Sequence, residues 1–318
     1  MDEILINGGN RLSGEVRISG AKNSALPILA STILSGGECV ITNLPRVVDV
    51  LTMGKLLGIL GAKVSHEGNR AVIEADMIAS TEAPYDLVKT MRASVLVLGP
   101  LVARCGEAKV SLPGGCAIGS RPVNLHLAGL AKLGAEISIE HGYITARAKR
   151  LRGARIYCDT PTVTGTENLM MAASLADGVT MLENAAKEPE IVDLAQFLVK
   201  RGARIHGAGT DVITIEGVPQ LHGGDHDVIP DRIEAGTYLA AGAMTRGEVT
   251  VTHCHPSHLE AVLMKLREAG ADVQEEKDRV HLNMPGPLKG TDVKTLPFPG
   301  FPTDMQAQYM ALMTQAEG

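Results

Sequence analysis

A fourfold internal repeat constrains the fold of this 318-residue chain more than any other feature of its sequence. A glycine followed by a β-rich run recurs at intervals of 69 to 72 residues, and a Gly-Ala-x-Val or Gly-Ala-x-Ile marker follows each one 23 to 28 residues later. The first set, the anchor glycines, comprises Gly37, Gly106, Gly178 and Gly247, and the second markers begin at Gly61, Gly134, Gly202 and Gly270. Two markers that recur in phase four times indicate one supersecondary unit repeated along the chain.

Each repeat contains the same order of predicted elements. A helix that is apolar on nearly all faces precedes the anchor glycine, and such a helix must be buried. The strand after that glycine leads to an amphipathic helix, which the glycine of the second marker ends as a C-cap. A hairpin closes the repeat, as in Lys63–Glu67, a Gly68-Asn69 turn and Arg70–Glu74. The buried helices are predicted at 24–34, 95–102, 169–175 and 236–244, and a further helix of this type follows Phe301. The pattern predicts an α/β fold with helices inside and sheets outside.

The loop at residues 112–125 distinguishes the second repeat from the others. It lengthens that repeat by about four residues and contains three glycines, Cys116 and Arg121. Glycines let a backbone approach a ligand, and an arginine presents a fixed fork of donors to phosphate or carboxylate. Neighbouring cations would lower the pKa of the thiol. Because a loop that served only the scaffold would have no reason to differ, we interpret it as functional.

Positive side chains accompany the predicted starts of the buried helices. The positions fourteen residues before the anchor glycines are Asn23, Arg92, Thr164 and Ile233, and Lys22 and Arg232 adjoin the first and the last. A helix N-terminus attracts anions, so a cation there opposes the helix dipole, and such local conflicts often mark a functional site. For any one of these residues alone, a solvent-facing position in the first helical turn is the structural alternative.

The composition excludes several classes of protein. A net charge of −6 and a pI near 5.9 argue against nucleic-acid binding. The N-terminus lacks the features of a signal peptide, and no apolar run is long enough to span a bilayer. The five cysteines are scattered without CxxC spacing, which favours neither a disulfide framework nor a structural zinc site. We expect a cytoplasmic protein of about two domains.

Six motifs, in order along the chain, carry a resemblance to a known family. They are Lys22-Asn-Ser-Ala-Leu-Pro, Tyr85-Asp-Leu-Val-Lys-Thr-Met-Arg-Ala-Ser, Ser111-Leu-Pro-Gly-Gly-Cys, Gly119-Ser-Arg-Pro-Val, Pro230-Asp-Arg-Ile-Glu and Phe301-Pro-Thr-Asp-Met-Gln-Ala-Gln. Over its whole length the chain resembles the UDP-N-acetylglucosamine 1-carboxyvinyltransferases. The resemblance implies a two-domain inside-out α/β barrel built from repeats of about 70 residues, three to a domain. One domain would comprise 22–229 and the other 1–21 with 230–318. The second domain is expected to be incomplete, because the family continues beyond the last repeat seen here.

The resemblance also implies a reaction and the residues that perform it. The family transfers the enolpyruvyl group of phosphoenolpyruvate to the 3′-hydroxyl of UDP-N-acetylglucosamine and releases phosphate, in the first committed step of peptidoglycan synthesis. Cys116 matches the acid, which also forms a covalent phosphoenolpyruvate adduct, and Asp304 matches the general base. The implied contacts of phosphoenolpyruvate are Lys22, Asn23 and Arg121. Those of the sugar nucleotide are Arg92, Arg121, Pro122, Val123, Asn124, Leu125, Thr160, Pro161, Thr162, Val163 and Asp304. No cofactor, metal, nucleic acid or membrane is expected.

Other interpretations remain open at this stage. A 5-enolpyruvylshikimate-3-phosphate synthase would share the fold and the enolpyruvyl chemistry but lacks the cysteine loop. A non-catalytic sugar-nucleotide-binding protein would bind its ligand without releasing phosphate. The run His253-Cys-His-Pro-Ser-His258 has donors that suit zinc or copper. Within the repeat, however, it is only a strand end. Asp225-His-Asp227 is predicted to be a polar connection between the domains.

Overall fold

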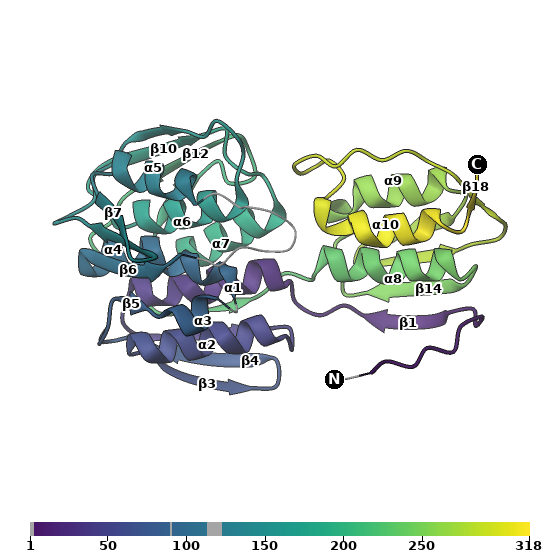
Figure 1. Ribbon diagram of the computed structural model, residues 1–318, viewed down its shortest axis with the longest axis horizontal. Helices are drawn as coiled ribbons and strands as arrows, with labels where there is room; N and C mark the ends of the chain where they lie inside the picture. Colours follow the sequence, from purple (N-terminus) through teal and green to yellow (C-terminus); the bar gives the residue numbers. More distant parts are fainter. Residues whose placement is uncertain (1–2, 90, 113–122) are drawn as a thin grey trace. The chain divides into compact units, whose positions relative to one another are not determined.

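A computed structural model describes residues 3–89, 91–112 and 123–318. The chain divides into two compact units, Gly20–Ile229 and the residues up to Ser19 together with Pro230–Gly318 (Figure 1). We call the first the large unit and the second the small unit. In the described part of the chain, no helix is long and apolar enough to cross a membrane.

Among the described residues, four sheets of four strands repeat one topology. The strand after each anchor glycine pairs with an antiparallel hairpin on one side and with a parallel strand on the other. In the large unit, the first sheet contains, in order, β13 (Gly224–Asp227), β2 (Glu38–Thr42), β4 (Arg70–Glu74) and β3 (Lys63–Glu67). The second contains β5 (Glu82–Ala83), β6 (Glu107–Ser111), β8 (Tyr143–Arg147) and β7 (Glu136–Glu140). The third contains β9 (Arg155–Tyr157), β10 (Val179–Glu183), β12 (Val212–Glu216) and β11 (Arg204–His206). In the small unit the sheet is β1 (Ser13–Arg17), β14 (Glu248–Thr252), β16 (Arg279–Asn283) and β15 (Asp272–Glu275). The predicted strands after the anchor glycines and the predicted hairpin are confirmed.

The parallel strands of two sheets are exchanged between repeats. β1 precedes the first buried helix in the sequence, yet it pairs with β14 of the fourth repeat. β13 precedes the fourth buried helix, yet it pairs with β2 of the first repeat. The prediction that 225–227 form a polar connection is therefore wrong, because this segment is a strand at the edge of a sheet. Its alternation places His226 in the interior at 4% exposure and leaves Asp225 and Asp227 exposed.

The large unit has helices in its interior and sheets outside, as the repeat predicts (Figure 1). The interior helices are α1 (Lys22–Ser31) with the 3₁₀ turn η1 (Thr32–Leu34), the 3₁₀ helix η2 (Arg92–Val97) with α4 (Leu98–Cys105), and α6 (Val163–Ala173). The other helices are α2 (Val48–Leu60), α3 (Tyr85–Val88), α5 (Asn124–Lys132) and α7 (Pro189–Lys200). All residues of α1 from Ser24 onward are buried. The second-marker glycines adopt φ between 94° and 110°, where a side chain would be strained, so they stop the preceding helices as predicted.

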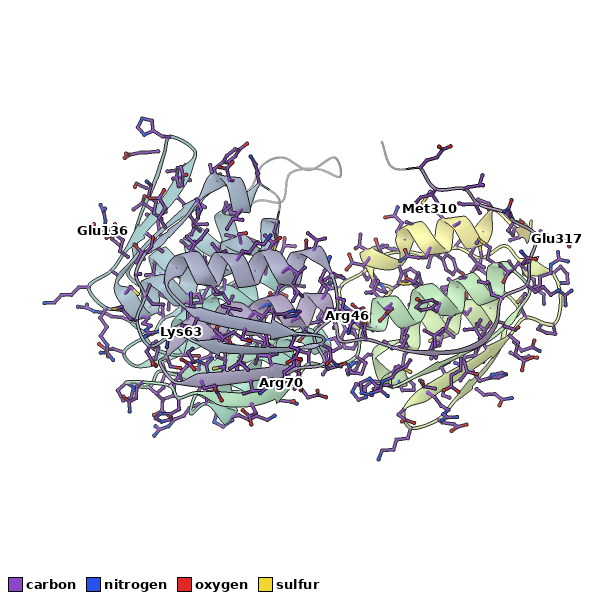
Figure 2. All side chains as sticks on the ribbon, turned by 90° about the horizontal axis from the view of Figure 1, so that it is seen from below. Arg46, Lys63, Arg70, Glu136, Met310 and Glu317 are labelled. Atoms are coloured by element: carbon purple, nitrogen blue, oxygen red, sulfur yellow. The ribbon has the colours of Figure 1, made fainter. Side chains whose placement is uncertain are left out.

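The small unit departs from the prediction of complete helix burial. It contains α8 (Arg232–Met244), η3 (Pro256–His258), α9 (Glu260–Glu268), β17 (Leu288–Lys289), η4 (Thr303–Met305), α10 (Gln306–Met313) and β18 (Ala316–Glu317). Tyr238 of α8 is 40% exposed. Met310 of α10, which is labelled in Figure 2, is 62% exposed. The described residues of this unit form one four-stranded sheet and one two-stranded sheet, so these apolar helices have packing partners on only part of their surface.

Two arginines satisfy backbone carbonyls at the end of α1 and in the 3₁₀ turn η1 that follows it. Arg201 is fully buried, and its guanidinium donates to the carbonyl oxygen of Ser31 at 2.9 Å and to that of His222 at 2.8 Å. Arg104 donates to the carbonyl oxygens of Ile33 at 2.9 Å and Ser35 at 3.0 Å. The last carbonyls of a helix have no partner within it and carry the negative end of its dipole, so these two cations complete the interior helix.

Arg201→Met should lower the free energy of unfolding by ~3 kcal/mol or more, because it leaves several buried carbonyls without a donor. Equilibrium denaturation in urea measures this loss. Arg204→Met is the matched control, since Arg204 forms an exposed ion pair with Glu216 on the neighbouring strand. Its effect should stay below ~1 kcal/mol. Similar losses in the two variants would contradict the assigned role of Arg201.

Candidate active site

The start of α1 is held in place by a buried polar network. Asp193 of α7 accepts a hydrogen bond from Ser24 Oγ at 2.5 Å and contacts His226 Nε2 at 2.8 Å. It also accepts from the backbone N–H of Ile229 at 3.2 Å, and the carbonyl of Ile229 in turn accepts from Ala21 N at 2.7 Å. This network fixes the residues that flank Lys22 and the point at which the chain leaves the large unit.

The predicted phosphoenolpyruvate contacts Lys22 and Asn23 occupy the first turn of α1. The Lys22 ammonium lies 3.6 Å from Asp49 Oδ2, and both side chains are about two-fifths exposed. Asp49 stands in the first turn of α2, where the helix dipole favours a negative charge. Lys22 is thus a partly exposed cation at a helix start, as the sequence predicts.

Two groups of predicted sugar-nucleotide contacts lie close together. Val123, Asn124 and Leu125 form the start of α5, while Thr160, Pro161, Thr162 and Val163 lead into α6. The Thr162 hydroxyl caps α6 by accepting from Gly165 N at 3.3 Å. His126 of α5 lies 3.3 Å from the Thr164 hydroxyl of α6, which connects the two helix starts. Helix N-termini bind anions, so this pair of starts suits a diphosphate.

On the interior side of the starts of α5 and α6 lie a buried imidazole, that of His126, and a buried amide, that of Asn168. His126 is 3% exposed, and burial lowers its pKa to about 4, so the ring is neutral at physiological pH. Its Nδ1 lies 3.0 Å from Asn168 Nδ2. The Asn168 amide also contacts the backbone of Val95 and Gly99, at 3.0 Å and 2.7 Å. One side chain of α6 therefore connects η2, α4 and α5.

The remaining predicted residues are distributed as follows. Arg92 is the first residue of η2, again at the start of a helix. Asp304 is exposed in η4 and belongs to the small unit. Cys116, Arg121 and Pro122 lie outside the described residues.

Sequence reasoning missed a buried acidic group within α6. Glu167 is 1% exposed, and burial, followed by the charges of Glu190 and Glu188, raises the pKa of its carboxyl well above the usual range. The available signal was the polar run Thr166-Glu167-Asn168 within an otherwise apolar helix. Buried polar side chains are usually hydrogen-bonded, as Asn168 is, whereas Oε1 of Glu167 has no hydrogen-bond partner among the described residues.

In the histidine-rich segment 253–258, His253 contacts the backbone of the protein and the Cys254 side chain is buried. His253 Nδ1 lies 3.2 Å from the carbonyl oxygen of Ile18, and the buried Cys254 thiol has its pKa raised by burial to about 11. Within the described residues, no three His, Cys, Asp or Glu side chains form a group that could hold a metal ion.

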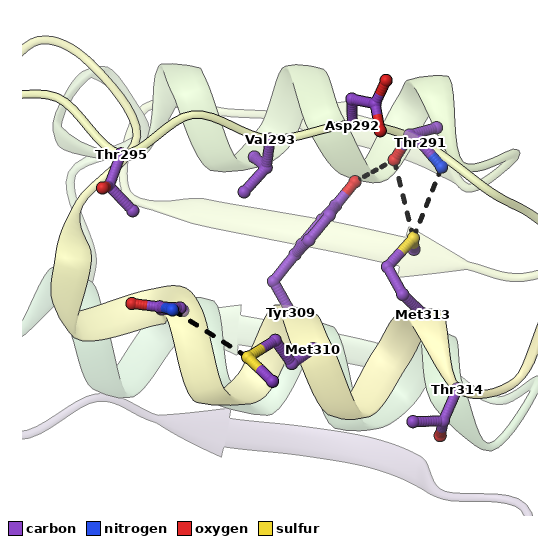
Figure 3. Close-up of a pocket in the computed structure, with 9 residues that line it drawn as sticks. Thr291, Asp292, Val293, Thr295, Tyr309, Met310, Met313 and Thr314 are labelled. Atoms are coloured by element: carbon purple, nitrogen blue, oxygen red, sulfur yellow. Dashed lines mark hydrogen bonds between the residues drawn. The ribbon is translucent and has the colours of Figure 1, made fainter.

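A groove of about 560 Å³ runs along α10 in the small unit (Figure 3). Tyr309 and Met313 both contact Thr291 in its wall. The lining residues are Thr291, Asp292, Val293, Thr295, Gln306, Tyr309, Met310, Met313 and Thr314. Asp292 is the one charged residue among them, so the groove does not suit a phosphate-bearing ligand. We therefore place the candidate active site at the helix starts.

Comparisons with known proteins all indicate similarity to enolpyruvyl or carboxyvinyl transferases. The sequence profile of the family described as EPSP synthase (3-phosphoshikimate 1-carboxyvinyltransferase) matches residues 6–318. A protein from Desulfatibacillum aliphaticivorans named UDP-N-acetylglucosamine 1-carboxyvinyltransferase is 57% identical over the whole chain, which covers 76% of that protein. A protein of the same name from Magnetococcus marinus is 56% identical, with the same coverage.

Solved structures support the same fold. The enolpyruvyl transferase NikO from Streptomyces tendae is 26% identical, with a TM-score of 0.87 over 98% of this chain and 75% of that protein. An EPSP synthase from Acinetobacter baumannii is 18% identical, with a TM-score of 0.70 over 89% of this chain and 67% of that protein. The latter likeness concerns the fold alone.

The stability of the chain should depend on pH through His126. The folded ring binds a proton only near pH 4, whereas the unfolded ring binds one near pH 6.5. The unfolded state therefore binds more protons between these values, and stability falls as the pH falls through this window. Well above pH 6.5, where the ring is neutral in both states, His126 contributes no pH dependence. Chemical denaturation across the window should show a steeper loss for the wild type than for His126→Asn. Parallel profiles would contradict the assignment.

Proposed function

Because this chain belongs to the EPSP synthase family and, within it, to the UDP-N-acetylglucosamine 1-carboxyvinyltransferases, we propose that it transfers the enolpyruvyl group of phosphoenolpyruvate to the 3′-hydroxyl of UDP-N-acetylglucosamine. Phosphate is released, and the product is a peptidoglycan precursor. The observation that carries the proposal is 57% identity along the whole chain to a protein of that name. The chain spans about three quarters of the length of these relatives.

Cys116 and Asp304 are the proposed proton donor and acceptor. A proton delivered to C3 of phosphoenolpyruvate makes C2 electrophilic, and the 3′-oxygen then forms a bond to C2 as Asp304 accepts its proton. Loss of a proton from C3 and departure of phosphate restore the double bond. Positioned acids and bases of this kind contribute about 10²- to 10⁴-fold to rates.

Positive side chains support both the acid and the leaving group. Lys22, Arg92 and Arg121 are proposed to neutralise the phosphate and carboxylate of phosphoenolpyruvate. Cations beside a thiol also lower its pKa, which suits Cys116 to acid–base work near neutral pH. Asn23 is proposed as a further contact of phosphoenolpyruvate.

The sugar nucleotide is proposed to bind at the paired starts of α5 and α6. Its contacts are the residues from Pro122 to Leu125 and from Thr160 to Val163, with Arg92, Arg121 and Asp304. The N-terminal ends of the two helices supply partial positive charge for the diphosphate.

The proposed domains are 22–229 and 1–21 with 230–318. We also propose a cytoplasmic location, which the free thiols of Cys39, Cys105, Cys158 and Cys254 support. Thiols persist in reducing compartments.

Phosphate release tests the proposed reaction. The purified chain should release phosphate from phosphoenolpyruvate only when UDP-N-acetylglucosamine is present, and Cys116→Ser should lower kcat by about 100-fold or more because it removes the acid. Cys105→Ser changes an exposed thiol of α4 and should leave the rate unchanged.

Two outcomes would favour other functions. Release that depends on shikimate 3-phosphate instead would indicate a 5-enolpyruvylshikimate-3-phosphate synthase. Binding of UDP-N-acetylglucosamine by a folded chain without phosphate release would indicate a sugar-nucleotide-binding protein.

A further inference from the structure

The orientation of the Asn168 amide is fixed by backbone groups. Its Oδ1 accepts from Gly99 N–H at 2.7 Å, and its Nδ2 donates to the carbonyl oxygen of Val95 at 3.0 Å. A backbone N–H can only donate and a carbonyl can only accept, so the reversed amide would face like groups on both sides. A Cβ at position 99 would lie 2.3 Å from Oδ1, so the absence of a side chain there permits the contact.

The amide in turn fixes the proton on His126. The second hydrogen of Asn168 Nδ2 faces His126 Nδ1 at 3.0 Å, which requires that nitrogen to accept. A neutral imidazole with an accepting Nδ1 carries its proton on Nε2. That Nε2–H then donates to Thr164 Oγ1, which is 3.3 Å away.

The two hydrogen bonds run from Asn168 to His126 and from His126 to Thr164, so the Thr164 hydroxyl still has its own hydrogen to donate. Its Oγ1 accepts from His126, and in the part of the chain that the structure describes no other side-chain partner of this hydroxyl occurs. Thr164 is half-buried, one residue beyond the 160–163 segment and beside the start of α5. It is therefore a hydroxyl donor at the proposed nucleotide site.

We propose that Asn168 is a positioning residue of this site, which fixes His126 as the Nε2–H tautomer so that the Thr164 hydroxyl donates to an oxygen of the nucleotide. The acceptor is a phosphate oxygen or a uracil carbonyl, which share the same acceptor chemistry. The assignment of Thr164 as a ligand contact rests on the proposed function, whereas the tautomer of His126 does not.

Nitrogen NMR of the full chain labelled with ¹⁵N-histidine tests the tautomer without substrate. At neutral pH His126 should show a protonated Nε2 and an unprotonated Nδ1. Asn168→Asp presents only acceptors to the ring, so Nδ1 should become protonated. The control is Asn184→Asp, which removes a comparable amide hydrogen bond to the Cys158 carbonyl and should leave the His126 signals in place. A wild-type ring protonated on Nδ1 would overturn the proposal, whether or not Asn168→Asp folds.

Calorimetric titration tests the ligand contact. Thr164→Val keeps the shape of the side chain but removes the donor, so the Kd for UDP-N-acetylglucosamine should rise about 3- to 10-fold, the range for one net hydrogen bond. Thr164→Ser should restore the affinity. A Thr164→Val effect that persists with uridine identifies the uracil carbonyl as the acceptor, and one seen with UDP but not uridine identifies a phosphate oxygen.

Kinetics separate positioning from a general structural effect. Asn168→Asp should raise the KM for UDP-N-acetylglucosamine and leave the KM for phosphoenolpyruvate unchanged. An equal Kd for wild type and Thr164→Val would overturn the ligand contact. A wild-type chain with the Nε2–H tautomer that binds no UDP-N-acetylglucosamine would support the tautomer assignment and refute the proposed substrate.

Discussion

The fold depends on providing hydrogen-bond donors for the backbone carbonyls at the ends of buried helices, which water does not reach. α1 is buried from Ser24 to its last residue, so its final carbonyls need donors from the protein itself. Arg201 of the third repeat donates to the last carbonyl of α1, and Arg104 of the second repeat donates to that of Ile33 in the 3₁₀ turn η1 that continues it. Each arginine can do so only when its own repeat has folded around α1. The capping of one helix thus makes the three repeats of the large unit mutually dependent, although the anchor glycines mark each repeat as a separate element in the sequence.

The sequence predicts elements that local chemistry determines and misses those that depend on pairing at a distance. The strands after the anchor glycines and the hairpin at 63–74 follow from periodicity and turn residues, and the structure confirms them. The exchange of β1 and β13 does not follow from the local pattern, because both are short strands that precede a buried helix and neither encodes its partner. For β1, only the family resemblance implied that residues 1–21 belong with 230–318. Tyr238 is exposed for a related reason. The burial of a helix face depends on what packs against it as well as on its own residues.

The candidate site shows the same division. The cations at helix starts were visible because counting from the anchor glycines locates those starts to within a residue. The connection of α5 to α6 through His126 was not visible, since it joins residues 38 positions apart in sequence. Asn168 could have been noticed as an amide in an apolar helix. Its three partners, however, lie on elements whose packing only the structure reveals.

The ion pair of Lys22 resolves the conflict between a cation and a helix N-terminus. Asp49 offsets the charge of Lys22 and is itself stabilised by the dipole of α2. Both side chains are partly exposed, and a pair of this kind contributes about 1 kcal/mol or less. In the proposed site, a ligand with a carboxylate and a phosphate would therefore displace the exposed contact between Lys22 and Asp49 at little cost. The ammonium of Lys22 stays partly exposed near the start of α1, which is the property that its proposed contact with phosphoenolpyruvate needs.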